Sequence, residues 1–462
     1  MELFSTINDF LWNYIMVEVM VVLALWFTIK TKAMQITMLP EMFRTLRGTT
    51  QKSEGGRTIS SFEAFLISLA SRVGVGNLAG VALAITIGGP GAIFWMWVMA
   101  ILNAATSFVE STLAQLYKSK DGNYFIGGPA YYISKGLKSR KLAVVVAILS
   151  VLTFSFIICS VQSNTIAISS EEAFGIPSIW TAIIIGVLMS LTIFGGIGRV
   201  AKVSSMLVPI MAFAYIFVVL CIVIANIQHL PAVFTMIIEN AFGINQVVGG
   251  GVGVAFMMGI KRGLFSNEAG MGSAPNAAAT ADVKHPVNQG FVQAMGVFVD
   301  TLLICSCTAF LIFLGGAGAS EELTGIALTQ YALSTHAGAW AYHFIAIIIF
   351  FFGFSTCISN SYYGEANIRF IKDDKRYVTI FRILMILIVM LGAVMPLDVV
   401  WAMADFLMVF IVLINLIAIT KLGGYTYLLL DDYKAQRKRG IKTPVFTKKA
   451  IKELDTPDIE CW

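Results

Sequence analysis

The chain has 462 residues, of which 57% are hydrophobic and only 13% are charged. Soluble globular proteins carry about a quarter charged residues, so this composition excludes an ordinary soluble protein. The charges lie mostly in short loops between apolar runs of about 20 residues, the length that spans the hydrocarbon core of a bilayer. We therefore predict an all-α polytopic membrane protein, whose net charge of +5 reflects its loops and indicates no affinity for nucleic acid.

The apolar runs predict eleven membrane-spanning helices. In chain order they cover residues 10–30, 59–88, 91–117, 141–170, 178–197, 204–226, 246–270, 287–315, 338–369, 377–396 and 398–420. We divide the chain accordingly into an N-terminal part with one extra helix (1–58), two groups of five helices (59–226 and 227–420) and a basic tail (421–462).

Two segments are expected to lie outside the membrane-spanning helices. Met34–Arg47 places Met34, Met38 and Met42 near one helical face, which predicts a helix at the membrane interface. The tail is rich in Lys and Arg, and we expect it to be solvated, with attraction to anionic lipid headgroups as the alternative.

The distribution of basic residues predicts the orientation of the helices. Every second loop, beginning with the one after residue 30, contains Lys or Arg, whereas the intervening loops contain none. The acidic residues of those intervening loops are Glu171, Glu172, Glu239, Glu321 and Glu322. Because loops rich in Lys and Arg stay in the cytoplasm, we expect a multi-pass plasma-membrane protein with its N-terminus outside and its C-terminus in the cytoplasm.

Two of the predicted helices contain residues that interrupt a helix. Residues 70–80 read Ala-Ser-Arg-Val-Gly-Val-Gly-Asn-Leu-Ala-Gly, which puts a charge and three glycines in the middle of an apolar run. Glycine is a poor helix former and a charge at bilayer depth is costly, so such a segment persists only where it lines a cavity or is buried in protein. A second glycine-rich run begins at Val248, and we place its break at Ala255–Gly259.

The two interrupted helices each open one group of five helices. Since five is odd, the two groups must have opposite orientations in the membrane. Glycine-interrupted helices at matching positions of two inverted halves indicate the binding site of a secondary transporter. The alternative interpretation is that the glycines only allow close packing of helices.

Backbone groups freed at the first break can bind both parts of an ionic ligand. The break at Gly74, Gly76 and Asn77 offers N–H groups to a carboxylate and carbonyl groups to a cation. On the fourth predicted helix, Gln162 is an amide at membrane depth that can hydrogen-bond a zwitterionic substrate. Hydrogen bonding between helices is the alternative role for such an amide.

Hydroxyl and carboxylate groups at membrane depth are further candidates. The adjacent hydroxyls of Ser355 and Thr356 suit a small hard cation, although bonding to the carbonyls of their own helix is the commoner role. Glu110 and Asp300 are candidate gate or proton-binding residues, because carboxylates inside a membrane are usually functional.

Asp405 belongs to the same group of carboxylates, and structural pairing with a basic residue such as Arg262 is the alternative role for all three. The sequence contains no nucleophile elbow, phosphate-binding loop or metalloprotease motif, so we expect neither an enzyme nor a bound cofactor.

Several motifs resemble those of the alanine/glycine:cation symporters, also called the sodium:alanine symporter family. They are Gly88–Trp97 (Gly-Gly-Pro-Gly-Ala-Ile-Phe-Trp-Met-Trp), Gly127–Tyr132, Arg262–Pro275 (which contains Ser-Asn-Glu-Ala-Gly), Gly296–Thr301, Phe354–Thr356 and Ser361–Glu365. The resemblance extends from about residue 60 to residue 420. It implies a leucine-transporter-like fold and sodium-coupled uptake of small neutral amino acids, alanine and glycine, by alternating access.

The resemblance also implies roles for individual residues. It implies a sodium site formed by Ala70, Val73, Ser355 and Thr356, which raises the cation-binding interpretation of the two hydroxyls above back-bonding. It implies that Gln162 lies near the substrate. Together with the two predicted breaks, this gives a candidate substrate site made of Gly74, Gly76, Asn77, Gln162, Phe256 and Asn360.

The chain departs from the pattern of that family at Arg72, Val75 and Asn360. A fixed guanidinium charge would repel an incoming cation, so one hypothesis is that Arg72 replaces sodium, in a carrier that is proton-coupled or sodium-independent. Pairing of Arg72 with a carboxylate is the rival hypothesis. Asn360 stands in place of a tryptophan, which favours a larger neutral amino acid such as glutamine. An amino-acid sensor derived from a transporter is the alternative from another functional class.

Overall fold

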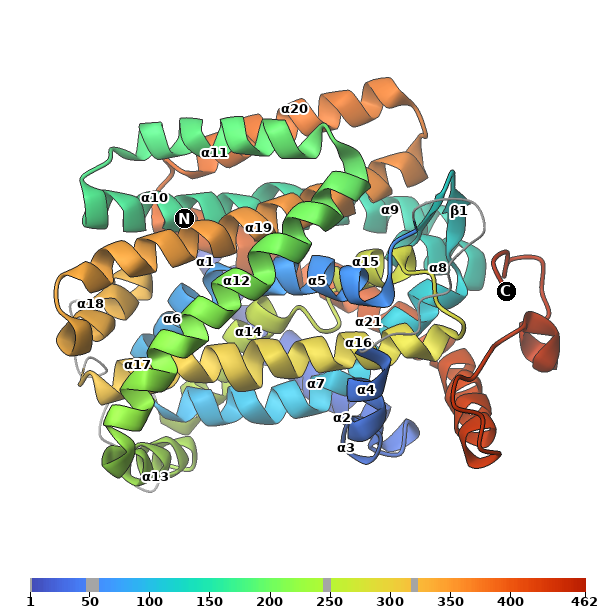
Figure 1. Cartoon of the computed structure of the whole chain (residues 1–462), viewed down its shortest axis with the longest axis horizontal. Helices are drawn as coiled ribbons and strands as arrows, with labels where there is room; N and C mark the ends of the chain where they lie inside the picture. Colours follow the sequence, from blue (N-terminus) through green and yellow to red (C-terminus); the bar gives the residue numbers. More distant parts are fainter. Residues whose placement is uncertain (1, 47–57, 244–250, 317–322) are drawn as a thin grey trace.

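The computed structural model describes the chain except residues 1, 47–57, 244–250 and 317–322, so Glu321 and Glu322 and the start of the second glycine-rich run lie outside the described residues. The described chain is almost entirely helical (Figure 1). Its strands, β1 (Ser119–Asp121) and β2 (Tyr124–Ile126), form one antiparallel hairpin.

The described residues of the first half of the chain form thirteen α-helices. They are α1 (Glu2–Leu11), α2 (Val17–Lys30), α3 (Met34–Thr37), α4 (Leu39–Leu46), α5 (Ser61–Arg72), α6 (Val81–Gly88), α7 (Gly91–Leu116), α8 (Pro129–Gly136), α9 (Arg140–Ser150), α10 (Cys159–Phe174), α11 (Ser178–Ile193), α12 (Gly196–Ala225) and α13 (Leu230–Ala241). Three wider π-helical turns adjoin these helices. Trp12–Met16 joins α1 to α2, Gly76–Gly80 precedes α6, and Val151–Ile158 joins α9 to α10.

In the second half, the part of the chain that the structure describes forms eight more α-helices. They are α14 (Gly251–Asn267), α15 (Ala274–Thr280), α16 (Pro286–Val297), α17 (Ser306–Leu314), α18 (Gly325–Ala337), α19 (Trp340–Ile371), α20 (Lys375–Gly392) and α21 (Leu397–Lys438). A π-helical stretch, Phe298–Cys305, joins α16 to α17, and short 3₁₀ turns lie at Ile227–His229, Lys448–Ala450 and Lys452–Leu454.

A helix lies at each of the eleven predicted membrane spans, but not every one can cross a bilayer by itself. Among the described residues, seven helices are long and apolar enough to span a membrane, or eight if the bent pair of α5 and α6 counts as one span. The remaining three are α11 and α14, with 16 and 17 residues, and α20, which carries Lys375, Arg376 and Arg382. The structure therefore confirms a polytopic membrane protein with a broken helix.

The first break lies where the sequence predicts it. A capping box starts α5, in which the Ser60 hydroxyl accepts from Glu63 N–H and the Glu63 carboxylate accepts from Ser60 N–H. The helix ends at Arg72, and the chain resumes its helical course at Gly76 with a bend of 51° between the two halves.

The second break lies elsewhere than predicted. α14 continues through Ala255–Gly259 to Asn267, and the helix is interrupted at residues 268–273 instead. Gly259 serves close packing, because a Cβ atom there would come within 2.5 Å of the Ala92 carbonyl oxygen of α7. In the interrupted segment Glu268, Gly270 and Gly272 have φ values of 56°, 88° and 83°, a left-handed conformation that a helix cannot contain.

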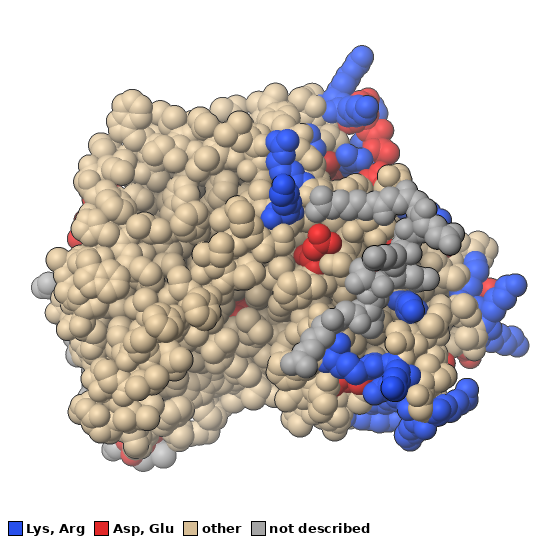
Figure 2. Space-filling model, viewed as in Figure 1, with Lys and Arg blue, Asp and Glu red and all other residues tan. Residues whose placement is uncertain are grey.

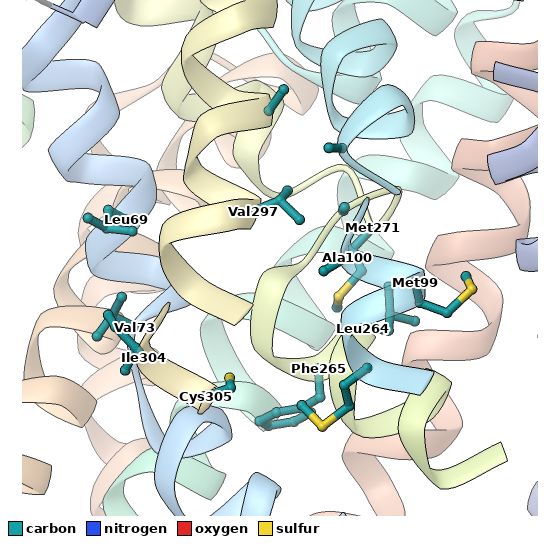
Figure 3. Packing of buried hydrophobic residues seen from close by; sticks show 14 of the residues in the cluster. Leu69, Val73, Met99, Ala100, Leu264, Phe265, Met271, Val297, Ile304 and Cys305 are labelled. Atoms are coloured by element: carbon teal, nitrogen blue, oxygen red, sulfur yellow. The ribbon is translucent and has the colours of Figure 1, made fainter. Parts of the chain in front are cut away.

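The broken helices lie at the centre of a layered bundle. α11 packs on α20 at one side of the molecule, and α10 packs on α19 in the next layer (Figure 1). α5 contacts α19 on one side and α16 on the other, while α14 packs on α7. Figure 3 shows apolar side chains around the breaks, with Leu69 and Val73 on one side and Phe265 and Leu264 on the other.

The predicted interfacial helix Met34–Arg47 forms two short helices, α3 and α4. Both Met34 and Met42 are fully buried, and α4 packs against α16. The apolar face predicted from the methionine spacing therefore exists, and in the described structure the protein itself covers those two side chains.

The tail is packed against the bundle, so the expectation of a merely solvated tail is wrong. α21 continues to Lys438, and beyond it Phe446, Leu454 and Ile459 are buried. The Trp462 indole N–H donates to the Gln115 carbonyl oxygen at 3.0 Å, at the end of α7. The prediction rested on the basic residues of the tail. The apolar residues between them, which pack against the bundle, were not considered.

We predict that Trp462→Ala releases the tail. The substitution removes the indole hydrogen bond and the ring contact with Phe446, whose centroid lies 5.7 Å away. A loss of about 2 kcal/mol would raise the undocked population about thirtyfold. Limited trypsin digestion should then cleave the Lys-rich segment beyond α21 correspondingly faster. Trp340→Ala, at a tryptophan that is 51% exposed, is the matched control and should digest like the wild type; equal rates for both variants would contradict a docking role for Trp462.

Candidate functional site

Four sequence-predicted residues meet at the first break. The Gly74 N–H donates to Asn77 Oδ1 at 2.8 Å, and the Val75 N–H donates to Gln162 Oε1 at 2.8 Å. A Cβ atom on Gly74 would lie 2.6 Å from Thr356 Oγ1 and 2.7 Å from Gln162 Oε1, so only glycine fits. α10 and α19 therefore press polar side chains directly onto the interrupted backbone.

These contacts define what the break can bind. At the break, backbone N–H groups have lost their acceptors within the helix. They donate instead to the side-chain oxygens of Asn77 and Gln162. A carboxylate is a stronger acceptor for such N–H groups than an amide oxygen, and it is also favoured by the positive end of the α6 half of the helix. The first break can thus exchange its own amide contacts for an anionic group.

The hydroxyls of Ser355 and Thr356 face the last turn of α5. Thr356 Oγ1 lies 3.0 Å from the Ala70 carbonyl oxygen and 3.2 Å from that of Ser71. Ser355 Oγ lies 3.4 Å from the Ala70 carbonyl oxygen. Both hydroxyls also bond to the Phe352 carbonyl of their own helix, at 2.9 and 3.1 Å, so back-bonding coexists with the contact to α5. Val73, the fourth predicted member of this group, is fully buried directly after α5.

Asp300 and Glu110 hold the interrupted segments in place. Asp300 accepts from Asn77 Nδ2 at 2.7 Å and from Ser266 Oγ at 2.7 Å, and thereby links the first break to the end of α14. Glu110 accepts from the N–H groups of Gly270 and Gly272 at 3.0 and 3.1 Å. Both carboxylates are completely buried, which would be costly without these donors.

Arg72 points away from the candidate cation site. Its Nη1 donates to the Gln293 carbonyl oxygen of α16 at 2.8 Å, and its Nη2 donates to Ser107 Oγ of α7 at 3.0 Å. The carbonyl groups of Ala70 and Ser71, by contrast, are approached by α19. Among the described residues no carboxylate forms an ion pair with Arg72. The hydrogen bonds of the guanidinium go to neither an acidic side chain nor the Thr356 hydroxyl.

The remaining predicted substrate residues are not all together. A Cβ on Gly76 would lie 3.0 Å from the Phe265 ring and 3.1 Å from Ser266 Cα, so Gly76 lies against α14. Phe256 is only half-buried and packs edge-on against the Trp95 ring at 4.7 Å. The prediction of Phe256 followed from the misplaced second break, and the contacts described for it lie on α7.

Asp405 forms the ion pair that the sequence analysis gave as its alternative role. Its two oxygens accept from Arg262 Nη1 and Nη2 at 3.2 and 3.0 Å, and Lys261 Nζ lies 2.7 Å from Oδ2. The Arg262 guanidinium also stacks on the Trp401 ring, at 4.6 Å from its centroid. This bidentate contact joins α21 to the part of α14 that precedes the second break.

Sequence reasoning assigned no role to Ser71 and Glu268, which the structure places at the breaks beside the predicted substrate residue Asn360. Asn360 Oδ1 lies 2.9 Å from Ser71 Oγ, and the same hydroxyl lies 2.9 Å from Glu268 Oε2. Glu268 belongs to the Ser-Asn-Glu-Ala-Gly motif, so the motif itself was the available signal. Its partner Ser71 carries no comparable signal in the sequence.

Solved structures share this fold. The manganese transporter of Eremococcus coleocola, in complex with an aromatic bis-isothiourea substituted compound, is similar with a TM-score of 0.54 over 83% of this chain and 79% of that chain. The sequence identity is 15%, so the similarity concerns the fold alone, which is of the leucine-transporter type.

Curated sequences are similar over nearly the whole chain. The amino-acid carrier protein AlsT of Bacillus subtilis is 50% identical, covering 98% of this chain and 96% of that protein. The probable sodium/glutamine symporter GlnT of the same organism is 47% identical, covering 98% and 94%. The sodium/proton-dependent alanine carrier protein of Bacillus sp. (strain PS3) is 38% identical, covering 86% and 92%. Residues 1–448 match the Sodium:alanine symporter family, and the chain therefore belongs to this family of sodium-coupled amino-acid symporters.

Proposed function

We propose that the chain takes up a small neutral amino acid together with sodium, by alternating access around the first break. The observation that carries the proposal is that the backbone N–H groups of Gly74 and Val75, which here donate to side-chain amide oxygens, lie beside the hydroxyl of Thr356. One side of the break can bind the carboxylate of an amino acid, while the α19 side offers oxygens to a cation.

The proposed architecture is a five-plus-five inverted repeat with one extra N-terminal helix. The first repeat (59–226) contains α5 with α6, α7, α9 with α10, α11 and α12. The second repeat (227–420) contains α14 with α15, α16 with α17, α19, α20 and α21, the last of which continues into the tail. Interrupted helices open both repeats, which supports this division and its eleven membrane crossings.

The orientation we propose puts the N-terminus outside and the C-terminus in the cytoplasm. Lys and Arg gather at the end of the molecule that holds β1, α8 and the C-terminus, whereas most of the visible surface elsewhere lacks them (Figures 1 and 2). Such an excess of basic residues is typical of the cytoplasmic side of a plasma-membrane protein.

The proposed sodium ligands are the carbonyl groups of Ala70 and Val73 and the hydroxyls of Ser355 and Thr356. Support comes from the distances of 3.0 and 3.4 Å between the two hydroxyls and the Ala70 carbonyl oxygen. Because the described partners of Arg72 come from α7 and α16, we favour sodium over a guanidinium that replaces it.

The substrate is proposed to be alanine or glycine, with glutamine as the second candidate. Glutamine is favoured by the 47% identity to a probable sodium/glutamine symporter, and proton coupling is the second candidate for the driving ion because one relative is a sodium/proton-dependent carrier. Gln162 is the residue we expect to respond to the substrate, since its amide oxygen occupies the Val75 N–H.

Uptake into proteoliposomes tests the function directly. With an inward sodium gradient, we expect accumulation of labelled alanine that unlabelled alanine and glycine abolish, and that disappears when potassium replaces sodium. Competition by unlabelled glutamine at similar concentrations would assign the larger substrate. Binding of alanine without accumulation would instead identify a sensor, and accumulation driven by a proton gradient alone would reject sodium coupling.

Thr356→Val is predicted to weaken sodium activation of uptake. The substitution preserves the shape of the side chain and removes one oxygen ligand, so the sodium concentration for half-maximal uptake should rise about tenfold. Thr379→Val is the matched control, because Thr379 is exposed on α20 and its hydroxyl donates to the Lys375 carbonyl of its own helix. An unchanged sodium dependence in the Thr356 variant would remove this hydroxyl from the cation site.

Arg72→Met is predicted to lower stability while uptake still requires sodium. The guanidinium donates two buried hydrogen bonds, whose loss should cost on the order of 2 kcal/mol. Thermal unfolding in detergent measures the loss, with Arg376→Met at an exposed position as the control. A wild-type protein that transports without sodium, together with a variant that needs sodium, would establish the replacement of the cation by Arg72.

A further inference from the structure

Glu268 is a buried carboxylate with unusually few hydrogen-bond donors. It lies in the interrupted segment between α14 and α15 and is 2% exposed. Its side chain accepts from two hydroxyls, Ser71 Oγ at 2.9 and 3.0 Å and Ser273 Oγ at 2.6 Å. Among the described residues, no Lys, Arg or His forms an ion pair with it, and no N–H group donates to it.

The other two carboxylates at the breaks are better supplied. Glu110 accepts from two backbone N–H groups and from Asn415 Nδ2. Asp300 accepts from the amide of Asn77 in addition to the hydroxyls of Ser266 and Thr301. Since a buried carboxylate needs several donors or a counter-charge, Glu268 is the least well supplied of the three: it has hydroxyl donors alone, and the Arg72 guanidinium attracts it through space without a hydrogen bond.

Around Glu268 there are more acceptor oxygens than protons. Ser71 Oγ lies within 3.0 Å of both Glu268 oxygens and 2.9 Å from Asn360 Oδ1, yet a hydroxyl has a single proton to donate. The Nδ2 of Asn360 is buried and has no hydrogen-bond partner among the described residues. Turning the Asn360 amide over would supply one proton to Ser71, but it would still leave Glu268 with hydroxyl donors alone.

We propose that Glu268, Ser71, Asn360 and Ser273 form a second sodium site, separate from the proposed sodium site that contains Thr356. Together they supply five oxygens: two from the carboxylate, two from hydroxyls and one from an amide. Hard cations prefer such oxygens, and a positive ion would compensate the charge and remove the conflict between acceptors. The identity of the ion as sodium rests on the proposed function.

The second site would connect three moving parts of the proposed transporter. Ser71 belongs to the last turn of α5, Glu268 and Ser273 to the second break, and Asn360 to α19. Ser71 also joins the two sodium sites, since its carbonyl oxygen lies 3.2 Å from Thr356 Oγ1 while its hydroxyl contacts Glu268. Sodium at this site would therefore hold both interrupted helices against α19, and sodium activation should be cooperative.

Equilibrium binding of ²²Na⁺ to the purified full-length chain tests the second site without transport. We expect two ions per wild-type chain in the absence of amino acid, and one for Glu268→Gln. For Thr356→Val we expect two ions, one of them bound about tenfold more weakly. Glu172→Gln makes the same chemical change at an exposed residue in the last turn of α10 and should retain two ions. Two ions of unchanged affinity in Glu268→Gln would overturn the proposal.

Ser71→Ala decides the question if Glu268→Gln does not fold. It removes one hydroxyl oxygen, and we expect one of the two sodium affinities to fall about tenfold. A binding curve identical to that of the wild type would overturn the second site.

The same binding experiment keeps failure of the second site distinct from failure of the proposed function. Wild-type protein that accumulates alanine with sodium, while Glu268→Gln retains both ions, refutes only the second site. Loss of one ion in Glu268→Gln, in a chain whose wild type accumulates no amino acid, supports the site and refutes the transport function.

Discussion

The backbone of two interrupted helices has to find hydrogen-bond partners in a place where neither lipid nor bulk water can supply them. An unpaired N–H or carbonyl at that depth costs several kcal/mol, so each interruption persists only with dedicated partners. At the first break the partners are the side-chain amides of Asn77 and Gln162. At the second break they include the Glu110 carboxylate, which accepts from Gly270 and Gly272. The positions of α7, α10 and α19 follow from this requirement.

The same requirement explains the unusual number of buried polar and charged groups. Asp300 accepts hydrogen bonds from both interrupted helices, and Asp405 forms an ion pair with Arg262 and Lys261. Arg72 is accommodated because α16 has a glycine, Gly296, where any side chain would overlap the guanidinium. Hydrogen-bonded networks of this kind favour one arrangement of the helices, because every partner lost in an apolar medium is costly. Glu268 has the fewest donors among these carboxylates, because its hydrogen bonds come from the hydroxyls of Ser71 and Ser273 alone among the described residues.

Glycine has two different roles in this bundle, and the sequence does not distinguish them. Gly74 and Gly270 allow the chain to leave the helical path, the first by its lack of a side chain beside Thr356 and the second by a φ of 88°. Gly259 and Gly91 lie in regular helix and allow close contact with neighbouring helices, at Ala92 and at Ala241. A glycine count therefore located the first break correctly but misplaced the second. The misplaced break also led to the assignment of Phe256 to the substrate site. Only the approach of a second helix decides which role a glycine has.

The length and composition of the apolar runs determined the positions of the membrane helices, because both depend only on local sequence and on the thickness of the bilayer. The break at Gly74 and the hydroxyls of Ser355 and Thr356 could also be predicted from the sequence, since a helix breaker and paired hydroxyls stand out in an apolar run. Tertiary structure alone decided the direction of Arg72, the position of the second break at 268–273, the docking of Trp462 and the contact of Ser71 with Glu268. Each of these depends on which helix faces which. Contacts between residues almost 200 positions apart, such as Ser71 and Glu268, leave no periodic signal in a single sequence.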